Sequence, residues 1–112
     1  MTKRTYLSEF EQLALLSVLR LGDDANGAAI RRDLEQTAGR SVAVATIYVA
    51  LSRLEKQGLV RSWMSDPTPV RGGKARKYYA LEPSGIRALR ESKKTLELMW
   101  EGVGVALDST RT

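Results

Sequence analysis

The 112-residue chain contains no cysteine and no histidine, and both absences limit its chemistry. Without cysteine there is no disulfide framework and no thiolate metal site. Without histidine the usual zinc fingers, the usual nucleophile–base pairs and the easiest general acid–base group are excluded. No cluster of carboxylates compensates for these losses, so the sequence predicts neither an enzyme nor a bound metal or cofactor.

Long apolar runs are also missing. The longest fall far below the roughly 18–20 residues that span a bilayer, and residues 1–5 are not followed by the apolar core of a secretory signal. We therefore expect a cytoplasmic protein without a membrane partner. The length indicates one domain with an appended element, and a hydrophobic fraction of 43% is ordinary for a globular protein.

Positive charge is distributed unevenly along the chain. Between Arg53 and Ala80 there are seven basic and two acidic residues, while the remaining residues include eleven of each sign. The net charge of +5 therefore falls within this stretch, which is typical of a protein that binds a polyanion. The alternative is a basic loop that serves solubility alone, but here the charge coincides with a structural element.

Three helices are predicted in the first half of the chain. Ser8 and Glu11 form a capping box at the start of the first helix, which Gly22 ends. The second begins at Asn26 or at the next residue, and Gly39 stops it. A short turn then leads into the third helix, so the second and third helices are close neighbours.

The third helix, residues 43–57 with Ser41 as its cap, has two different faces. The core face holds evenly spaced apolar residues, namely Val44, Ile47, Leu51 and Leu54. The opposite face holds small or polar residues and one long side chain, namely Ala45, Thr46, Val49, Ala50 and Arg53. A helix that approaches another surface closely needs short side chains on the facing side. The second and third helices together therefore fit a helix-turn-helix. A plain three-helix core with an alanine-rich back is the alternative.

Two strands are predicted after Gly58. Residues 59–65 and 76–81 have strand-forming side chains, and the segment between them is long, basic and interrupted by proline and glycine. This order, a helix-turn-helix followed by a strand, a basic loop and a second strand, is that of a winged helix. The predicted fold is mainly α with a small β-hairpin: a winged helix-turn-helix over residues 1–82, followed by a dimerisation helix.

That C-terminal dimerisation helix is predicted over residues 83–107, followed by a disordered tail at residues 108–112. A heptad seam runs along it with one polar position, and its members are Ile86, Leu89, Lys93, Leu96, Trp100, Val103 and Leu107. Gly102 and Gly104 weaken the far end of the helix. The seam could be ordinary core, but the three-helix core already has its own faces, so we expect a homodimer.

The seam also offers a candidate effector site. Trp100, with Leu96 and Met99 nearby, could line a cavity for a flat apolar ligand. The alternative is that Trp100 simply fills the dimer interface.

The DNA-binding residues are predicted from the groove geometry, because a B-form major groove admits one α-helix. Thr46 and Arg53 are candidates for hydrogen bonds to bases, while Ala45 and Val49 could contact thymine methyl groups. Tyr48 could give its hydroxyl to a phosphate, or it could be an ordinary half-buried aromatic residue.

The remaining candidates flank that helix. Ser41 lies before it, and the wing supplies four basic residues for phosphates or the minor groove, namely Arg71, Lys74, Arg76 and Lys77. Stacking of RNA bases on Tyr78 and Tyr79 is a weaker interpretation, since neighbours on one strand point to opposite faces.

These motifs together resemble the PadR-like transcriptional regulators, from Phe10 to about Val103. The resemblance is carried by Ala45-Thr46-Ile47-Tyr48, by Leu51-x-x-Leu54-Glu55-x-x-Gly58-Leu59-Val60, by Arg76-Lys77-Tyr78-Tyr79-Ala80-Leu81 and by Ser84-Gly85. The family usually has glycine where Ala45 stands, a departure that bears on how tightly the helix start meets DNA.

The resemblance implies a dimeric winged helix-turn-helix repressor of the short form, with the last and first helices building the dimer. Some relatives bind drug-like or phenolic compounds between the paired helices through an aromatic residue, for which Trp100 is the candidate here. The leading hypothesis is a repressor that binds double-stranded DNA at a palindromic operator and that an apolar or aromatic effector releases. The alternatives are a winged-helix protein-interaction module and a ligand sensor with weak DNA binding.

Overall fold

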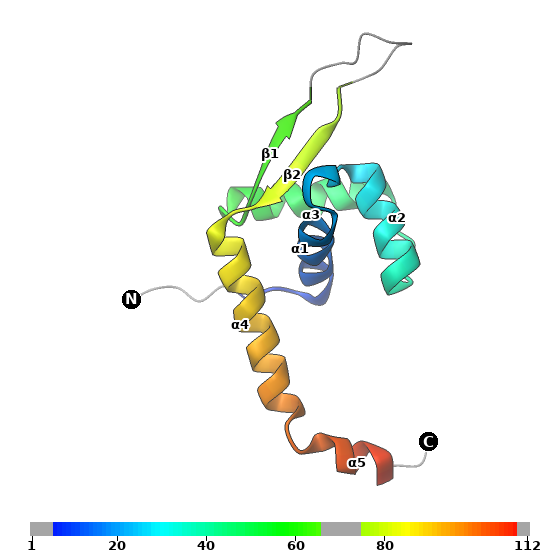
Figure 1. Cartoon of the computed structure of the whole chain (residues 1–112), viewed down its shortest axis with the longest axis vertical. Helices are drawn as coiled ribbons and strands as arrows, with labels where there is room; N and C mark the ends of the chain where they lie inside the picture. Colours follow the sequence, from blue (N-terminus) through cyan, green and yellow to red (C-terminus); the bar gives the residue numbers. More distant parts are fainter. Residues whose placement is uncertain (1–5, 66–74, 110–112) are drawn as a thin grey trace.

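The structure is a computed structural model that describes residues 6–65 and 75–109. Its elements, in chain order, are α1 (Glu9–Leu21), the 3-10 turn η1 (Gly22–Asp24), α2 (Gly27–Ala38), α3 (Val44–Lys56), β1 (Val60–Met64), β2 (Lys77–Leu81), α4 (Pro83–Trp100) and α5 (Val103–Ser109). The body is formed by α1, α2, α3 and the hairpin, and α4 projects from it (Figure 1). This arrangement confirms the mainly helical fold class with a small β-hairpin.

The helix ends of α1 and α2 follow the local sequence. The amide of Ser8 donates to Glu11 Oε1 at 2.7 Å and the amide of Glu11 donates to Ser8 Oγ at 3.1 Å, so the capping box forms. Asn26 caps α2 by accepting the Ala29 amide at 3.0 Å, and Gly39 ends it with a left-handed backbone at φ 66°.

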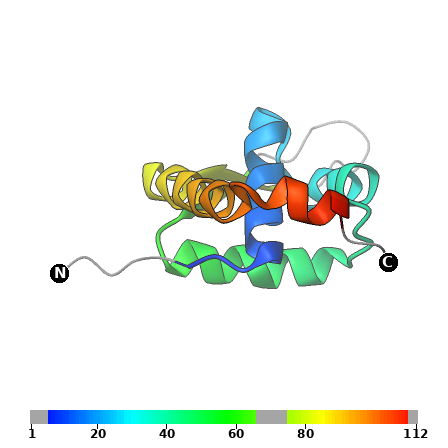
Figure 2. The same cartoon turned by 90° about the horizontal axis from the view of Figure 1, so that it is seen from below.

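The core lies between α1, α2, α3, the hairpin and the first half of α4, and α1 crosses α3 when seen from below (Figure 2). Ile47, Leu51 and Leu54 are fully buried, which confirms the predicted core face of α3. Each such aliphatic side chain stabilises the fold by about 1.5–3 kcal/mol.

Ser41 does not cap α3, so that prediction is wrong. The N-cap is Ala43, and no side chain accepts a hydrogen bond there. The carbonyl of Ala43 already accepts the amides of Thr46 at 3.0 Å and Ile47 at 3.3 Å, so the first turn closes two residues beyond Ser41.

The hairpin is antiparallel, and its register pairs Val60 with Leu81 and Trp63 with Tyr78. Tyr79 points inward and is 1% exposed, which confirms that one of the neighbouring tyrosines belongs to the core. The Tyr79 amide donates to the Ala25 carbonyl at 2.9 Å and so ties β2 to the turn before α2. The tip of the predicted wing, including Arg71 and Lys74, lies outside the described residues.

The start of α4 is fixed to the end of α3. Ser84 Oγ donates to the Gly58 carbonyl at 2.6 Å, and the Glu82 amide donates to the Leu59 carbonyl at 2.9 Å. A Cβ atom at Gly85 would lie 2.2 Å from the Leu59 carbonyl oxygen, so only glycine allows this close approach. The direction of α4 is therefore set by the body that carries α3.

The single helix predicted over residues 83–107 is interrupted, which corrects that expectation. Helix α4 ends at Trp100, and Gly102 adopts φ 76° before α5 begins at Val103. A left-handed residue breaks the helical hydrogen-bond ladder, so the chain changes direction and the seam does not continue straight to Leu107 (Figure 1). Asp108, predicted to begin a disordered tail, belongs to α5.

Candidate nucleic-acid interface

The outer face of α3 is open to solvent as the sequence predicts. The predicted reading residues on it, Ala45, Thr46, Val49 and Arg53, are all exposed, and Ala50 lies at the margin with intermediate burial. The side chain of Val49 is 60% exposed although it is apolar. Ser41 is exposed in the turn that precedes this helix.

Tyr48 is packed on one side and open on the other. Its ring lies 6.4 Å from the ring of Tyr79, and 39% of the residue is exposed. A Cβ atom at Gly27 would lie 2.6 Å from the Tyr48 hydroxyl oxygen, so the first residue of α2 leaves room for this ring. The ring of Tyr48 is therefore half-buried, as the alternative interpretation of the sequence expects. That its hydroxyl contacts a phosphate stays a prediction.

A hollow of about 530 Å³ separates α3 from β2. It is lined by Tyr48, Val49, Ser52, Arg53, Lys56, Lys77 and Tyr79. Three of these side chains are cationic and none is a carboxylate. The α3 members follow a single helical stripe at intervals of three and four residues, and β2 supplies the opposite wall.

Besides the core residue Tyr79, two lining residues were not among the predicted DNA-binding residues, namely Ser52 and Lys56. Their spacing from Val49 and Arg53 is the signal that could have identified them, since residues three or four apart share one face of a helix. Lys77, predicted as part of the wing, lines the hollow rather than the wing tip. The structure therefore brings Lys77 together with Arg53 and Lys56.

The cations near the hollow have no acidic partner in the described part of the chain, whereas several arginines elsewhere are paired with carboxylates. Four arginines remote from the hollow each contact a carboxylate at 2.6–3.3 Å, in the pairs Arg20–Asp33, Arg31–Glu35, Arg40–Glu9 and Arg61–Glu82. Among the described residues, no such pair involves Arg53, Lys56, Arg76 or Lys77. The positive potential at this face is thus not neutralised within the described part of the chain.

The acidic residue of α3 is directed to the hairpin. Glu55 accepts the Ser62 amide at 3.2 Å and the Ser62 hydroxyl at 2.8 Å, and it does not line the hollow. Tyr79 also lines the hollow, and its burial, together with the nearby Tyr48 and Glu55, raises its pKa to about 12. Tyr79 is therefore neutral at physiological pH, and its ring adds no negative charge to the hollow.

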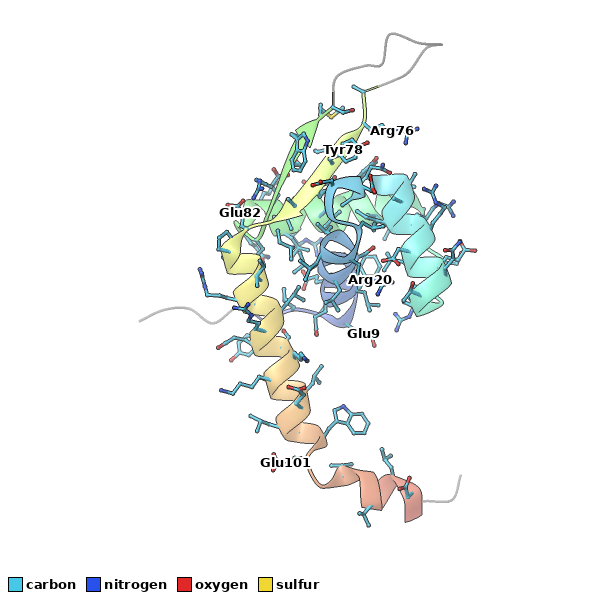
Figure 3. The ribbon with its side chains drawn as sticks, viewed as in Figure 1. Glu9, Arg20, Arg76, Tyr78, Glu82 and Glu101 are labelled. Atoms are coloured by element: carbon cyan, nitrogen blue, oxygen red, sulfur yellow. The ribbon has the colours of Figure 1, made fainter. Side chains whose placement is uncertain are left out.

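Arg76 is exposed at the base of the wing, next to Tyr78 (Figure 3). Its amide donates to Ser65 Oγ at 2.9 Å, which holds the two strands together where the described part of the hairpin ends. On the outer face of the same hairpin, Tyr78 and Trp63 stack with ring centroids 6.3 Å apart. Sequence reasoning did not find this aromatic pair, because it depends on the cross-strand register.

The predicted effector residues all lie on the exposed far half of α4. Leu96, Met99 and Trp100 are 49%, 72% and 58% exposed. A groove of about 550 Å³ between α1 and α4 is lined by Gln12, Leu16, Leu19, Ile86, Leu89, Arg90, Lys93 and Leu96. Of the three predicted residues only Leu96 lines this groove, while Met99 and Trp100 lie further along the helix.

Neither a metal site nor a membrane span is found in the part of the chain that the structure describes. Across residues 6–65 and 75–109, histidine, cysteine and carboxylate side chains nowhere gather in threes close enough to hold a metal ion. Over the same ranges, every helix is too short or too polar to cross a bilayer.

Comparison with known proteins identifies the family. Residues 15–91 match the transcriptional regulator PadR-like family. The chain is 34% identical over 94 residues to the transcriptional regulator Rv3488 of Mycobacterium tuberculosis, which covers 81% of this chain and 83% of that protein. Among solved structures, a PadR family transcriptional regulator from Eggerthella lenta shares 31% identity with a TM-score of 0.68, over 91% of this chain and 88% of that one.

A PadR-like transcriptional regulator from Bacillus cereus has the same fold, with a TM-score of 0.72 at 22% identity over 90% of this chain and 93% of that one. Regulators of this family bind DNA, commonly dimerise and are not enzymes, which confirms the predicted absence of catalytic activity. The matched residues extend from α1 into α4 and so include the helix-turn-helix and the hairpin. The chain belongs to the PadR-like family of transcriptional regulators.

Proposed function

We propose that this protein is a homodimeric repressor that reads a palindromic DNA site with α3 and holds the flanking backbone with its hairpin. The observation that carries the proposal is the unneutralised positive charge along α3 and β2, beside an α3 face of short side chains. Short side chains allow the helix to approach base edges, and cations without acidic partners are available to phosphates.

The residues have distinct roles in this proposal. Thr46 and Arg53 hydrogen-bond to bases, and Ala45 and Val49 contact thymine methyl groups. Contacts to phosphates come from Tyr48 and from residues at the helix start and in the wing, namely Ser41, Arg71, Lys74, Arg76 and Lys77.

The dimer is proposed to form through α1 and α4. Leu16 and Leu19 are 41% and 52% exposed, and with Leu96 they line the apolar groove between these two helices. A second copy related by a two-fold axis would cover this surface and place the two α3 helices about 34 Å apart, one turn of DNA. A palindromic site follows from that symmetry.

An effector that releases the repressor is a further part of the proposal. The α1–α4 groove is mostly apolar and could take a flat apolar or aromatic molecule beside Leu96, with Met99 and Trp100 approaching from the paired subunit. A ligand there would change the angle between the two subunits and thus the spacing of the reading helices. Quenching of tryptophan fluorescence by an aromatic compound would support this role, and lack of any effect of bound compound on DNA affinity would contradict it.

The test of DNA reading compares Arg53→Ala with Arg87→Ala. Both changes remove one positive charge per chain, but Arg87 is exposed on α4, away from the proposed reading face. Arg53→Ala should reduce discrimination at one base pair per half-site by about 1–3 kcal/mol, whereas Arg87→Ala should leave it unchanged. Fluorescence anisotropy on duplexes that differ at single base pairs measures this. Equal sequence preference in both variants would remove Arg53 from base reading.

Repression is tested separately by transcription in vitro from a template whose promoter overlaps the recovered binding site. Added protein should lower transcript yield. An increase would show that the bound protein is an activator, without affecting the argument for DNA binding.

A further inference from the structure

The hollow between α3 and β2 joins the two elements that are proposed to contact DNA. One wall comes from the helix, with Ser52 and Lys56 one turn apart, and the other comes from the strand, with Lys77. Neither wall carries a carboxylate. The hollow is therefore a place where donors from the reading helix and from the wing converge on the same volume.

Lys77 is held at this place by its own strand neighbours. Its ammonium nitrogen lies 5.9 Å from the centroid of the Tyr79 ring, within the range of a cation–π contact, and the residue is half-buried. The Tyr79 ring is itself fixed by burial and by its contact with Tyr48. The charge of Lys77 is thus partly preorganised toward the hollow, unlike that of a lysine on a free loop.

The chemistry of the walls selects an anion with several acceptor oxygens. The two ammonium groups offer only charge and hydrogen-bond donors, the serine hydroxyl can donate as well, and lysine binds phosphate as a point charge. A backbone phosphodiester has two non-bridging oxygens that can accept from opposite sides. The position of the hollow beside the reading face of α3 places it next to the backbone of a duplex that α3 enters.

We propose that this hollow is a phosphate subsite in which Lys56 and Ser52 of α3 and Lys77 of β2 hold one and the same phosphodiester of the bound DNA. The inference rests on the proposed DNA-binding function and adds two residues to it, Ser52 and Lys56. A phosphate shared between helix and strand fixes the wing relative to α3. The subsite therefore positions Arg53, on the same helical stripe, at a constant depth in the groove.

The test is the salt dependence of binding to a mixed-sequence duplex, measured for Lys56→Gln, Lys77→Gln and the double variant. Each phosphate contact contributes about 0.9 to the slope of log affinity against log salt concentration. If the two lysines share one phosphate, either single variant keeps that phosphate neutralised and changes the slope by much less than this amount. The double variant should then flatten the slope by about 0.9 per subunit.

Lys94→Gln is the matched control, because Lys94 is exposed on α4 and should leave the slope unchanged. If each single variant flattened the slope by about 0.9 per subunit and the double variant by the sum of the two, the lysines would bind two separate phosphates and the shared subsite would be overturned. An unchanged slope in all three variants would also overturn it. In both cases the unaltered protein still binds DNA, whereas failure of the unaltered protein to bind any duplex at low salt would overturn the proposed function itself.

Discussion

Replacing Gly85 with alanine should loosen α4 from the rest of the molecule. The added Cβ atom would lie 2.2 Å from the Leu59 carbonyl oxygen and 3.2 Å from its carbonyl carbon. These are backbone atoms, and the same oxygen accepts the Glu82 amide at 2.9 Å, so no side-chain rotation can relieve the overlap. The first turn of α4 must instead move away by about 1 Å to reach an ordinary contact distance.

The cost can be worked from the contacts at this joint. Overpacking against a fixed neighbour costs about 1–3 kcal/mol. The shift also weakens the bond from Glu82 to Leu59 and the bond from Ser84 to Gly58, each of which contributes about 1 kcal/mol. Alanine regains about 1 kcal/mol through its higher helix propensity. With both bonds lost, the expected net loss is about 2–4 kcal/mol, which lowers the melting temperature by roughly 8–20 °C for a domain of this size.

Thermal unfolding followed by circular dichroism measures this loss, and Gly104→Ala is its control. Gly104 lies in α5, and a Cβ atom there would meet no atom within 4 Å, so its replacement should leave the melting temperature unchanged or slightly raised. If Gly85→Ala were as stable as the unaltered protein, α4 would not be packed closely against Leu59. The argument that the body carrying α3 sets the direction of α4 would then fail.

Three further predictions concern other parts of the molecule. Gly27→Ala would place a methyl group 2.6 Å from the Tyr48 hydroxyl oxygen, so the Tyr48 ring must turn outward. DNA affinity should then fall several-fold with little change in melting temperature, and an unchanged affinity would refute a role of Tyr48 in DNA binding. Burial alone would raise the pKa of Asp33, but hydrogen bonds from Arg20, Ser17 and Thr37 lower it below 3.8. Its stabilisation is complete above that pH and is lost as the pH falls through the lowered pKa, so Asp33→Asn should cost about 1–3 kcal/mol at neutral pH and flatten this acid-induced loss. Denaturant titrations at several pH values measure both effects. If Asp33→Asn and the unaltered protein lost stability equally as the pH fell, the lowered pKa of Asp33 would not contribute to stability. Trp100→Asp should weaken the dimer in sedimentation velocity, and a dimer of unaltered affinity would exclude Trp100 from the interface.

Local features of the fold could be predicted from the sequence because they depend on residues a few positions apart. The capping box of Ser8 and Glu11 and the stop at Gly39 are examples. The division of α3 into a buried and an open face follows from periodicity alone, and so does the inward turn of one tyrosine in β2. Those patterns were enough to indicate the helix-turn-helix and the hairpin.

Features that depend on how elements are oriented in space could not be predicted in the same way. The convergence of Lys56 and Lys77 on one hollow needs the relative placement of α3 and β2, which no local spacing encodes. In α1 the sequence does not distinguish Leu15 from Leu16, yet the first is fully buried and the second is 41% exposed. The sequence marks Gly102 as a weak point of the last helix, but the heptad pattern continues past it, so the left-handed turn that separates α4 from α5 was not predicted.

The most direct measurement of the central claim is selection of bound fragments from a pool of random-sequence duplexes by the purified protein. The arrangement of α3, the hairpin and α4 predicts recovery of an inverted repeat whose half-sites are about one helical turn apart. Recovery of no enriched motif, or of a motif without two-fold symmetry, would contradict reading by a symmetric pair of α3 helices.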